Sequence, residues 1–304
     1  THELLLQSLR ERMWSASSLE KWVSCPVKWF VEQLLEPRPF APDAEPLARG
    51  GLAHAALADT LSALRDRTGS ARVTPAVLPL TLELLDEALA RNEPEHPLSV
   101  SVERRVAVRR RLRADLARYV EYAAGLESAL EPRELEVGFG FSGEDDRGEA
   151  SELPAYDLGG GVLMRGRIDR IDVSPSGDAV VMDYKSSFAP KAADWLADGH
   201  LQMGLYMRAV EGLMKMPVAA GIYQPLSGPA LRPRGLVSCE ADLGLDATRT
   251  DLREGEEIAE TLDGVLAIAL QAAAEARRGD LDPRPATCGF RGSGCAYPTI
   301  CRCE

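Results

Sequence analysis

The sequence lacks any long hydrophobic run. Its longest apolar stretches, such as Val180–Met182 and Val265–Leu270, are far shorter than the roughly 20 residues that a membrane-spanning helix needs. It also lacks an export signal, because Thr1–Arg12 is a charged amphipathic stretch. These two absences predict a soluble, cytoplasmic protein. The first residue is Thr rather than Met, which indicates a processed chain or a fragment of a longer protein.

The sequence also lacks an excess of positive charge. Its 35 Lys and Arg residues stand against 47 Asp and Glu residues, which gives a net charge of −12. That balance argues against broad attraction to a polyanion but leaves room for a local basic groove. Ser101–Arg118 holds seven Arg residues against Glu103 and Asp115, a local charge of +5. This segment either lines a nucleic-acid path or is a solvated helix balanced by acidic neighbours.

Cysteine is scarce except near the end of the chain. Four of the six cysteines fall in the last 17 residues, and the full set is Cys25, Cys239, Cys288, Cys295, Cys301 and Cys303. A secreted protein would use such residues for disulfides, but no export signal opens this chain. The tight terminal group therefore predicts ligation of a metal ion or a metal cluster.

The pattern of polar and apolar residues divides one domain into three stretches. Residues 1–130 are expected to be helical, 131–230 to form a sheet with a crossover helix, and 231–304 to form a helix and a cysteine-rich tail without regular structure. A capping box at Ser17–Glu20 begins the first helix, which restarts at Pro26. The other expected helices are Glu45–Arg67, Leu80–Ala90, Glu103–Leu126, Asp194–Met214 and Leu245–Arg278. This order of elements indicates an α/β fold.

Four segments carry the signals of strands. In Glu134–Phe141, apolar residues alternate with Glu and Gly, which predicts one buried face. Val162–Val173 and Ala179–Lys185 are separated by Ser-Pro-Ser-Gly-Asp, a turn sequence that joins adjacent antiparallel strands. Val218–Gln224 follows the crossover helix. Together these segments predict a small mixed sheet.

The sharpest chemical signal lies on the two turn-connected strands. Gly166-Arg-Ile-Asp169 is followed, 14 residues after the aspartate, by Asp183-x-Lys185. Antiparallel pairing brings Asp169 and Asp183 together, and two close carboxylates favour a hard divalent cation between them. Asp183 and Lys185 share one face of a strand, so the lysine can position a water molecule or neutralise charge on a phosphate. The alternative is that these are ordinary carboxylates at strand ends.

These residues resemble the core of the PD-(D/E)XK nuclease superfamily, and more narrowly its RecB/AddB-like branch. Three further motifs resemble those of that branch, in the same order: Gly51-Leu-Ala-His54 on a helix, Glu136-Val-Gly-Phe139 on the strand before the core, and Gln202-Met-Gly-Leu-Tyr206 on the helix after it. The resemblance covers nearly the whole chain. It implies a restriction-endonuclease-like mixed sheet with flanking helices and an N-terminal helical region.

The resemblance also implies a metal site. Asp169 and Asp183 would hold Mg²⁺ or Mn²⁺, with His54 as a third ligand and the carbonyl of Tyr184 as a further one. His54 lies among Ala and Leu residues, so the alternative is a histidine of the hydrophobic core.

Four other residues receive roles from the same resemblance. Lys185 would orient the attacking water, Glu136 would support the site, and Gln202 and Tyr206 would contact DNA or order Lys185. Each has a simpler interpretation. Glu136 fits the polar face of a strand, while Gln202 and Tyr206 are four positions apart and share one helix face.

The cysteines resemble the ligands of an iron–sulfur cluster in AddB-type proteins. Cys25, Cys288, Cys295 and Cys301 are the expected ligands of a [4Fe–4S] cluster, and four thiolates would also suit zinc. The interval Cys288-x6-Cys295 is four residues longer than the family pattern, so Cys303 is an alternative to Cys288. Cys239 is expected to be an ordinary thiol.

The implied activity is a metal-dependent DNA nuclease, in particular an exonuclease in DNA end processing or recombinational repair. The implied partners are DNA and a helicase subunit or helicase domain. One alternative is a module of a helicase–nuclease complex that holds DNA ends without cutting them. A second is a zinc-stapled scaffold of another fold.

Overall fold

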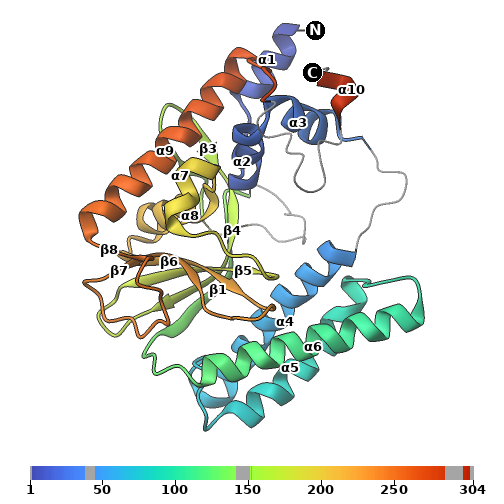
Figure 1. The fold of residues 1–304 in the computed structure, drawn as a ribbon, viewed down its shortest axis with the longest axis vertical. Helices are drawn as coiled ribbons and strands as arrows, with labels where there is room; N and C mark the ends of the chain where they lie inside the picture. The colour runs from blue at the N-terminus through green and yellow to red at the C-terminus, as the bar shows by residue number, and fades with distance from the viewer. Residues whose placement is uncertain (1, 38–44, 142–150, 152, 285–296, 302–304) are drawn as a thin grey trace.

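A six-stranded mixed sheet lies between two groups of helices (Figure 1). The computed structural model describes residues 2–37, 45–141, 151, 153–284 and 297–301. Within these ranges, none of the helices is both long and apolar enough to span a bilayer. The α/β class expected from the sequence is confirmed.

The sheet has the strand order β1-β4-β5-β6-β7-β8. Its strands are β1 (Glu131–Phe139), β4 (Gly166–Val173), β5 (Ala179–Lys185), β6 (Val218–Pro225), β7 (Arg234–Ser238) and β8 (Leu252–Arg253). The β5–β6 and β7–β8 pairs are parallel, and the other neighbours are antiparallel. A separate hairpin consists of β2 (Tyr156–Asp157) and β3 (Leu163–Met164). The expected antiparallel pairing of the two strands around the turn is confirmed.

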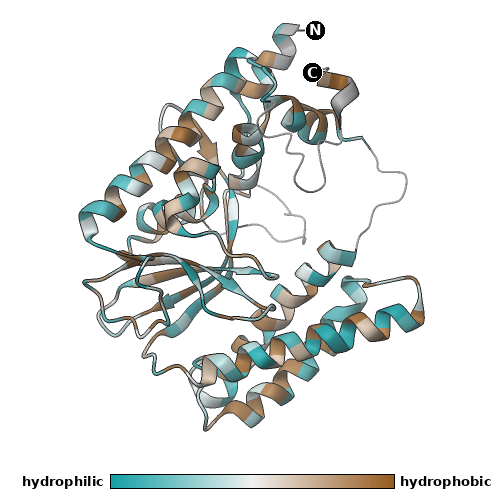
Figure 2. Cartoon of the chain, viewed as in Figure 1, coloured by the Kyte–Doolittle hydropathy of each residue, from teal (hydrophilic) through white to brown (hydrophobic). Residues whose placement is uncertain are grey.

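The two faces of the sheet bury two hydrophobic clusters. Along β5, Ala179 and Val181 point into one cluster, while Val180, Met182 and Tyr184 point into the other. This alternation follows from the two-residue period of a strand. Figure 2 shows hydrophobic residues along the central strands and hydrophilic residues repeated along the outer helices. A strand covered on both faces explains the uninterrupted apolar run at this point of the sequence.

Helices from both ends of the chain cover the first face. They are α1 (His2–Arg10), α2 (Ala16–Ser24), α3 (Pro26–Phe30), α7 (Trp195–Asp198), α8 (Gln202–Ala209) and α9 (Gly255–Arg278), with π-helical turns at Val31–Leu35 and Val210–Met214. Trp14, Trp22 and Trp29 are fully buried between them, and the Trp22 and Trp29 ring centroids lie 5.0 Å apart. Trp22 Nε1 also donates to Glu275 Oε2 of α9 at 3.0 Å. These contacts hold α2 against α3 and α9.

Three helices cover the opposite face. They are α4 (Glu45–Thr68), α5 (Leu78–Asn92) and α6 (Val102–Ala124), and the turn Glu93–Glu95 follows α5. Figure 1 shows them as a layer across the sheet from α8 and α9. All three were expected, with ends that differ by at most two residues. The buried side chains of α4 include Leu52, Leu57 and Leu64, on the stripe that faces the core.

Two helix predictions were wrong in extent. Asp194–Met214 is not one helix, because Gly199 adopts a left-handed conformation (φ 70°) that ends α7. Leu245–Arg278 becomes a helix only from Gly255, and the preceding residues include the edge strand β8. The strands β7 and β8 were not expected, since neither has a strong alternating pattern.

Two local predictions also need correction. The N-cap of α2 is Ser15, whose Oγ accepts the N–H of Ser18 at 3.2 Å, so Ser17–Glu20 is not a capping box. The restart at Pro26 is confirmed. Residues 285–304, expected to lack regular structure, include the short helix α10 (Pro298–Cys301).

Candidate functional site

Three side chains from three elements meet at one edge of the sheet. His54 of α4, Glu136 of β1 and Asp169 of β4 each offer a ligand atom, and these atoms lie within 4.8 Å of one another. His54 Nδ1 is 3.3 Å from Asp169 Oδ1 and 3.9 Å from Glu136 Oε1. One imidazole nitrogen and two carboxylates form a donor set that suits a divalent cation. We call these three residues the ligand cluster.

The sheet register explains why Glu136 and Asp169 meet. On either side of them, Leu135 pairs with Arg170 and Val137 pairs with Ile168. Glu136 therefore lies opposite Asp169 in the β1–β4 pair. Glu136, to which the sequence assigned only a supporting role, is thus placed among the potential ligands.

Glu136 has an unusual backbone conformation. Its φ is +53°, a left-handed value that costs a non-glycine residue about 1–3 kcal/mol and persists only where surrounding contacts hold it. The side chain of Arg167 donates to the Glu136 carbonyl at 2.9 Å. The sequence predicted that Leu135, Val137 and Phe139 would share one buried face. Phe139 is fully buried, but Leu135 and Val137, on either side of Glu136, are only half-buried.

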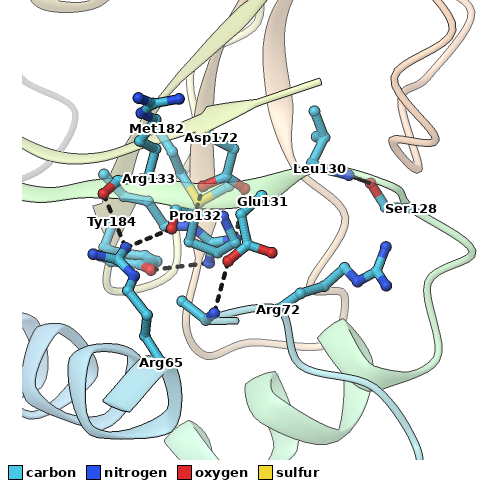
Figure 3. A network of polar contacts seen from close by, with 12 residues as sticks. Arg65, Arg72, Ser128, Leu130, Glu131, Pro132, Arg133, Asp172, Met182 and Tyr184 are labelled. Atoms are coloured by element: carbon cyan, nitrogen blue, oxygen red, sulfur yellow. Dashed lines mark hydrogen bonds and ion pairs between the residues drawn. The ribbon is translucent and has the colours of Figure 1, made fainter. Parts of the chain in front are cut away.

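His54 is positioned by an anchor further along α4. Arg65 lies 11 residues beyond His54, about three helical turns, so both side chains face the sheet. Arg65 donates to the carbonyls of Pro132 and Arg133 at 2.6 and 2.9 Å. Figure 3 shows this anchor at the start of β1. The same strand carries Glu136, so α4 and β1 are held together at the ligand cluster and beyond it.

A second group of side chains lies on β5 and α8. Lys185 Nζ is 2.6 Å from Asp183 Oδ2, as expected for residues two positions apart on a strand. Gln202 connects them, because its Nε2 donates to Asp183 Oδ1 at 2.9 Å and its Oε1 accepts from Lys185 Nζ at 3.1 Å. We call Asp183, Lys185 and Gln202 the lysine cluster.

The two clusters adjoin one another across β4 and β5. Arg170 pairs with Met182, so Asp169 and Asp183 occupy the next opposed positions, as the sequence predicted. Burial, followed by the negative charge of Asp169, raises the pKa of Asp183 to about 7, although Lys185 opposes this shift. Two neighbouring carboxylates that cannot easily ionise at the same time form a site where a bound cation can replace a proton.

The pKa of His54 is shifted in the same sense as that of Asp183. Burial disfavours the charged imidazole and lowers its pKa. The hydrogen bond and charge of Asp169, with smaller contributions from Glu136 and Asp183, outweigh burial and raise the pKa of His54 to about 9. Within the described structure, His54 is therefore a residue of the acidic site rather than a histidine of the hydrophobic core.

Tyr184 links the two clusters to a buried polar network. Its N–H donates to Asp169 Oδ2 at 2.7 Å, and its ring packs edge-on against His54, with centroids 5.7 Å apart. Its hydroxyl accepts from Arg170, which forms a two-pronged bond with Asp172. Asp172 and Tyr184 appear beside the α4 anchor in Figure 3. The expected role of the Tyr184 carbonyl stays a prediction.

Tyr206 is buried beneath the site. Its ring meets that of Phe139 at 6.0 Å, nearly at right angles. Gly166 makes room for both rings, since a Cβ there would lie 2.9 Å from each. Burial raises the pKa of the Tyr206 hydroxyl. This packing explains the glycine at the start of the Gly166–Asp169 motif.

Sequence reasoning missed Glu20. Its Oε1 accepts the backbone N–H groups of Leu201 and Gln202 at 2.7 and 2.8 Å. The interpretation as part of a capping box found the right chemistry but the wrong helix. No local pattern indicates a partner 181 positions away in the chain.

The cysteines are only partly within the described structure. Cys25 is buried between α2 and α3, Cys301 ends α10, and Cys239 is exposed after β7. Cys288, Cys295 and Cys303 lie outside the described residues.

The segment that leads into the cysteine tail is tied to the region of Cys25. Arg284 donates to the carbonyl of Val23 and to Glu275. In Figure 1, α10 lies at the same end of the long axis as α1–α3. Arg284, just before the tail, is thus bonded to Val23, which precedes Cys25 by two residues.

The arginine-rich segment forms α6, and its arginines are exposed. Three of them pair with acidic residues of other segments: Arg104 with Glu45, Arg109 with Glu93, and Arg113 with Asp86. At these three positions the arrangement agrees with a solvated helix balanced by acidic neighbours. Arg105, Arg110 and Arg111 leave a basic exposed surface on the same helix.

Comparison with known proteins adds independent information. The profile of the PD-(D/E)XK nuclease superfamily matches residues 13–302. The chain is 30% identical over 244 residues to a subunit of the ATP-dependent helicase/deoxyribonuclease of Lacticaseibacillus casei, covering 76% of this chain and 20% of that protein. It is 38% identical over 120 residues to the same-named protein of Desulforudis audaxviator, covering 36% of this chain and 10% of that one.

The chain therefore spans about a fifth or less of the length of these curated relatives. Its similarity to them is distant. The profile match, in contrast, includes all the residues of both the ligand cluster and the lysine cluster. The order of the motifs, the geometry of the two clusters and the extent of the match agree, and the chain belongs to the PD-(D/E)XK nuclease superfamily.

Proposed function

We propose that this chain is a metal-dependent deoxyribonuclease that hydrolyses phosphodiester bonds. The observation that carries the proposal is the ligand cluster directly beside an ordered lysine. Membership of a nuclease superfamily supports the reaction class, and the geometry supports the assignment of residues within it.

The metal site would be built from both clusters. His54, Glu136 and Asp169 would hold Mg²⁺ or Mn²⁺, and Asp183 and the Tyr184 carbonyl would complete the ligands. The donor set fits, because it offers hard oxygen atoms and one imidazole within reach of one ion. When bound, a divalent cation polarises a phosphate oxygen and lowers the pKa of water.

The protein's own side chains would prepare the attack. Lys185 lies at the rim of the site, where its ammonium group can orient a water molecule and stabilise negative charge that develops on the phosphate. Gln202 holds Lys185 in place through its carbonyl oxygen. Tyr206 supports this arrangement from below through its packing on Phe139. Gln202 was expected either to contact DNA or to order Lys185, and its direct contact with Lys185 supports the second role.

DNA would reach the site across α4 and α6. A cavity of about 140 Å³ beside His54 is lined by residues of both helices, among them Arg49 and Asp115. The exposed arginines of α6 would contact the phosphate backbone at a distance from the chemistry. The relatives' name pairs a helicase with a deoxyribonuclease, which favours a helicase subunit or domain as the partner, and the expected mode of action is that of an exonuclease on DNA ends.

The cysteines would hold a [4Fe–4S] cluster that clasps the two ends of the chain. Cys25 is buried, and the Arg284–Val23 bond brings the tail toward it. Cys25, Cys288, Cys295 and Cys301 would be the ligands, with Cys303 as the alternative to Cys288. Loss of iron and thermal stability in Cys25→Ala, with neither lost in Cys239→Ala, is the expected result. Full retention of both by Cys25→Ala would contradict the clasp, and zinc in place of iron would identify the other metal.

The function is tested by sizing the products of end-labelled DNA. Single-stranded and duplex substrates are incubated with the protein and Mg²⁺ or Mn²⁺, in parallel with Asp183→Ala. The wild-type protein should cut and the variant should not, while its fold is retained because the substitution also removes repulsion with Asp169. Binding of ends without any cleavage would instead indicate a DNA-holding module. Full activity of Asp183→Ala would contradict the assigned site.

A further inference from the structure

Glu20 caps a helix to which it does not belong. It lies on α2, yet its Oε1 accepts the N–H groups of Leu201 and Gln202 at the start of α8. The first N–H groups of a helix have no partner within the helix, and its dipole favours a negative charge there. One carboxylate oxygen therefore satisfies two donors that would otherwise need water.

The capped turn is the one that arranges the lysine cluster. Gln202 is the first residue of α8; its backbone is bonded to Glu20, and its side chain bridges Asp183 and Lys185. The next N–H, that of Met203, donates to the Tyr223 hydroxyl at 3.2 Å. Lys185 Nζ in turn lies 5.1 Å from the centroid of the Tyr223 ring. Contacts to three successive N–H groups thus fix the turn that carries Gln202.

The start of α8 lacks a local cap. Leu201 precedes the helix and makes no capping bond through its side chain, and the left-handed Gly199 separates α8 from α7. Even with the π-helical turn Val210–Met214 that follows its eight residues, α8 is too short to be stable by itself. The direction of its first turn, and therefore of the Gln202 side chain, depends on contacts from outside.

The element that carries Glu20 is rigid. Trp22, two residues further along α2, is fully buried against Trp29 and bonded to Glu275 of α9. Glu20 is therefore presented to α8 from a fixed position. The C-cap of α2 is Cys25, so Glu20 and Cys25 are held by the same helix.

We propose that Glu20 is a positioning residue for the hydrolytic reaction: through the first turn of α8 it orients Gln202, and through Gln202 it orients Lys185 toward the phosphate. This role rests on the proposed nuclease function. Glu20 touches neither substrate nor metal in this scheme. Its contribution is to the geometry of a group that acts in the transition state, where small displacements have large effects on rate.

The matched test compares Glu20→Ala with Glu275→Ala. Each variant removes one partly buried carboxylate that ties α2 to another helix, so both should lower Tm. Glu20→Ala should also lower kcat by about 10- to 100-fold with KM for DNA within about twofold of wild type, because ground-state binding is unchanged. Glu275→Ala should leave kcat unchanged. Glu20→Gln, whose amide oxygen still accepts both N–H groups, should recover most of the lost rate.

Two further measurements exclude a merely structural role. In the metal-free protein, Glu20→Ala should accelerate hydrogen exchange at the Leu201 and Gln202 amides and shift the NMR signals of the Gln202 side-chain amide, whereas Glu275→Ala should do neither. In a Lys185→Ala background, Glu20→Ala should lower kcat no further, because both act through one group.

The outcomes separate this role from the proposed function. If Lys185→Ala loses cleavage while Glu20→Ala keeps its full kcat, the positioning role is overturned and the nuclease assignment stands. Equal kcat losses in Glu20→Ala and Glu275→Ala would also overturn it. Full cleavage by Lys185→Ala would overturn the assignment of the site and the role of Glu20 with it.

Discussion

Two adjoining groups of side chains meet at this site, and they differ in what holds them. The ligand cluster brings together two carboxylates and an imidazole, and the backbone of Glu136 is left-handed. The negative charge of the carboxylates raises the pKa of His54. The lysine cluster is closed by reciprocal hydrogen bonds among Asp183, Lys185 and Gln202. One group has repulsion that a cation would relieve, and the other is already ordered.

This difference assigns separate energetic roles. Metal binding should relieve repulsion in the ligand cluster, so its residues, together with Asp183, determine affinity for the ion. The lysine cluster needs no rearrangement before reaction, which is the condition under which a charged group lowers a transition-state barrier most. Variants of the ligand cluster and variants of Lys185 should therefore fail in different measurements.

The largest expected effect comes from the ligand cluster. Asp169→Asn should abolish measurable metal binding and lower cleavage by at least about 10³-fold, since the ion supplies several kcal/mol of charge stabilisation. The fold should be retained, because the amide oxygen can still accept the Tyr184 N–H, but Tm near neutral pH should fall, because His54 loses the charge that raises its pKa. Isothermal titration with Mn²⁺ and a cleavage assay provide the measurements.

Asp172→Asn is the matched control on the same strand. It breaks the buried pair with Arg170, and it should lower unfolding free energy by about 3–5 kcal/mol without changing affinity for the ion. Normal cleavage by Asp169→Asn would remove the distinction between the clusters.

A smaller effect is expected in the lysine cluster. Lys185→Ala should bind Mn²⁺ as well as wild type does but lower kcat by about 10²- to 10³-fold, because the loss falls on the transition state. The same titration and single-turnover cleavage separate the two quantities. A matching collapse of metal affinity would show that the clusters act as one unit.

The pH dependence should distinguish the metal-free from the metal-bound protein. The folded pKa values of His54 and Asp183, about 9 and about 7, both lie above the ordinary values of 6.5 and 3.8. Stability from such raised values is complete below the ordinary pKa and is lost as pH rises through the folded pKa. The Tm of the metal-free protein should therefore contain a component from Asp183 that falls between about pH 4 and 7 and a component from His54 that falls between about pH 6.5 and 9.

Metal affinity should follow the opposite trend. Because the ion displaces protons from these groups, affinity for Mn²⁺ should rise by up to about tenfold per pH unit for each proton released. Proton release can be counted by titration in buffers of different ionisation enthalpy. A pH-independent affinity between pH 6 and 9 would contradict the protonated states that we assign to His54 and Asp183 in the metal-free protein.

The smallest effect concerns the packing that joins the clusters from below. Gly166→Ala would place a Cβ against the rings of both Phe139 and Tyr206, and it should lower unfolding free energy by about 1–3 kcal/mol. Gly50→Ala is the control, because nothing lies within 4 Å of a Cβ there. In the helix α4 it should stabilise by about 0.5–1 kcal/mol. Chemical denaturation measures both, and equal shifts would show that the crowding at Gly166 is absorbed.

Much of the hairpin that carries Asp169, Asp183 and Lys185 follows from short-range sequence pattern. The turn sequence between β4 and β5 predicts their antiparallel pairing, and that pairing alone places Asp169 opposite Asp183. The neighbours Asp183 and Lys185 need only the two-residue period of a strand. These features lie within one hairpin, where sequence separation is small and few arrangements compete.

What the sequence did not predict depends on distant contacts. The break in the crossover helix at Gly199 and the capping of α8 by Glu20 require α2 to pack beside it. The left-handed Glu136 is unfavourable by itself and is tolerated only within the assembled β1–β4 pair. Neither local propensity nor spacing contains that information.

The cap that Glu20 places on α8 also sets an order of events during synthesis. A ribosome releases α2 early, whereas the turn that receives Glu20 and the helix α9 that covers Trp22 emerge much later. Lys185 is therefore made before Gln202, the residue that orders it, and closing so long a loop between Glu20 and α8 delays that arrangement. A chain that ends before α8 would carry Asp183 and Lys185 without the side chain that bridges them.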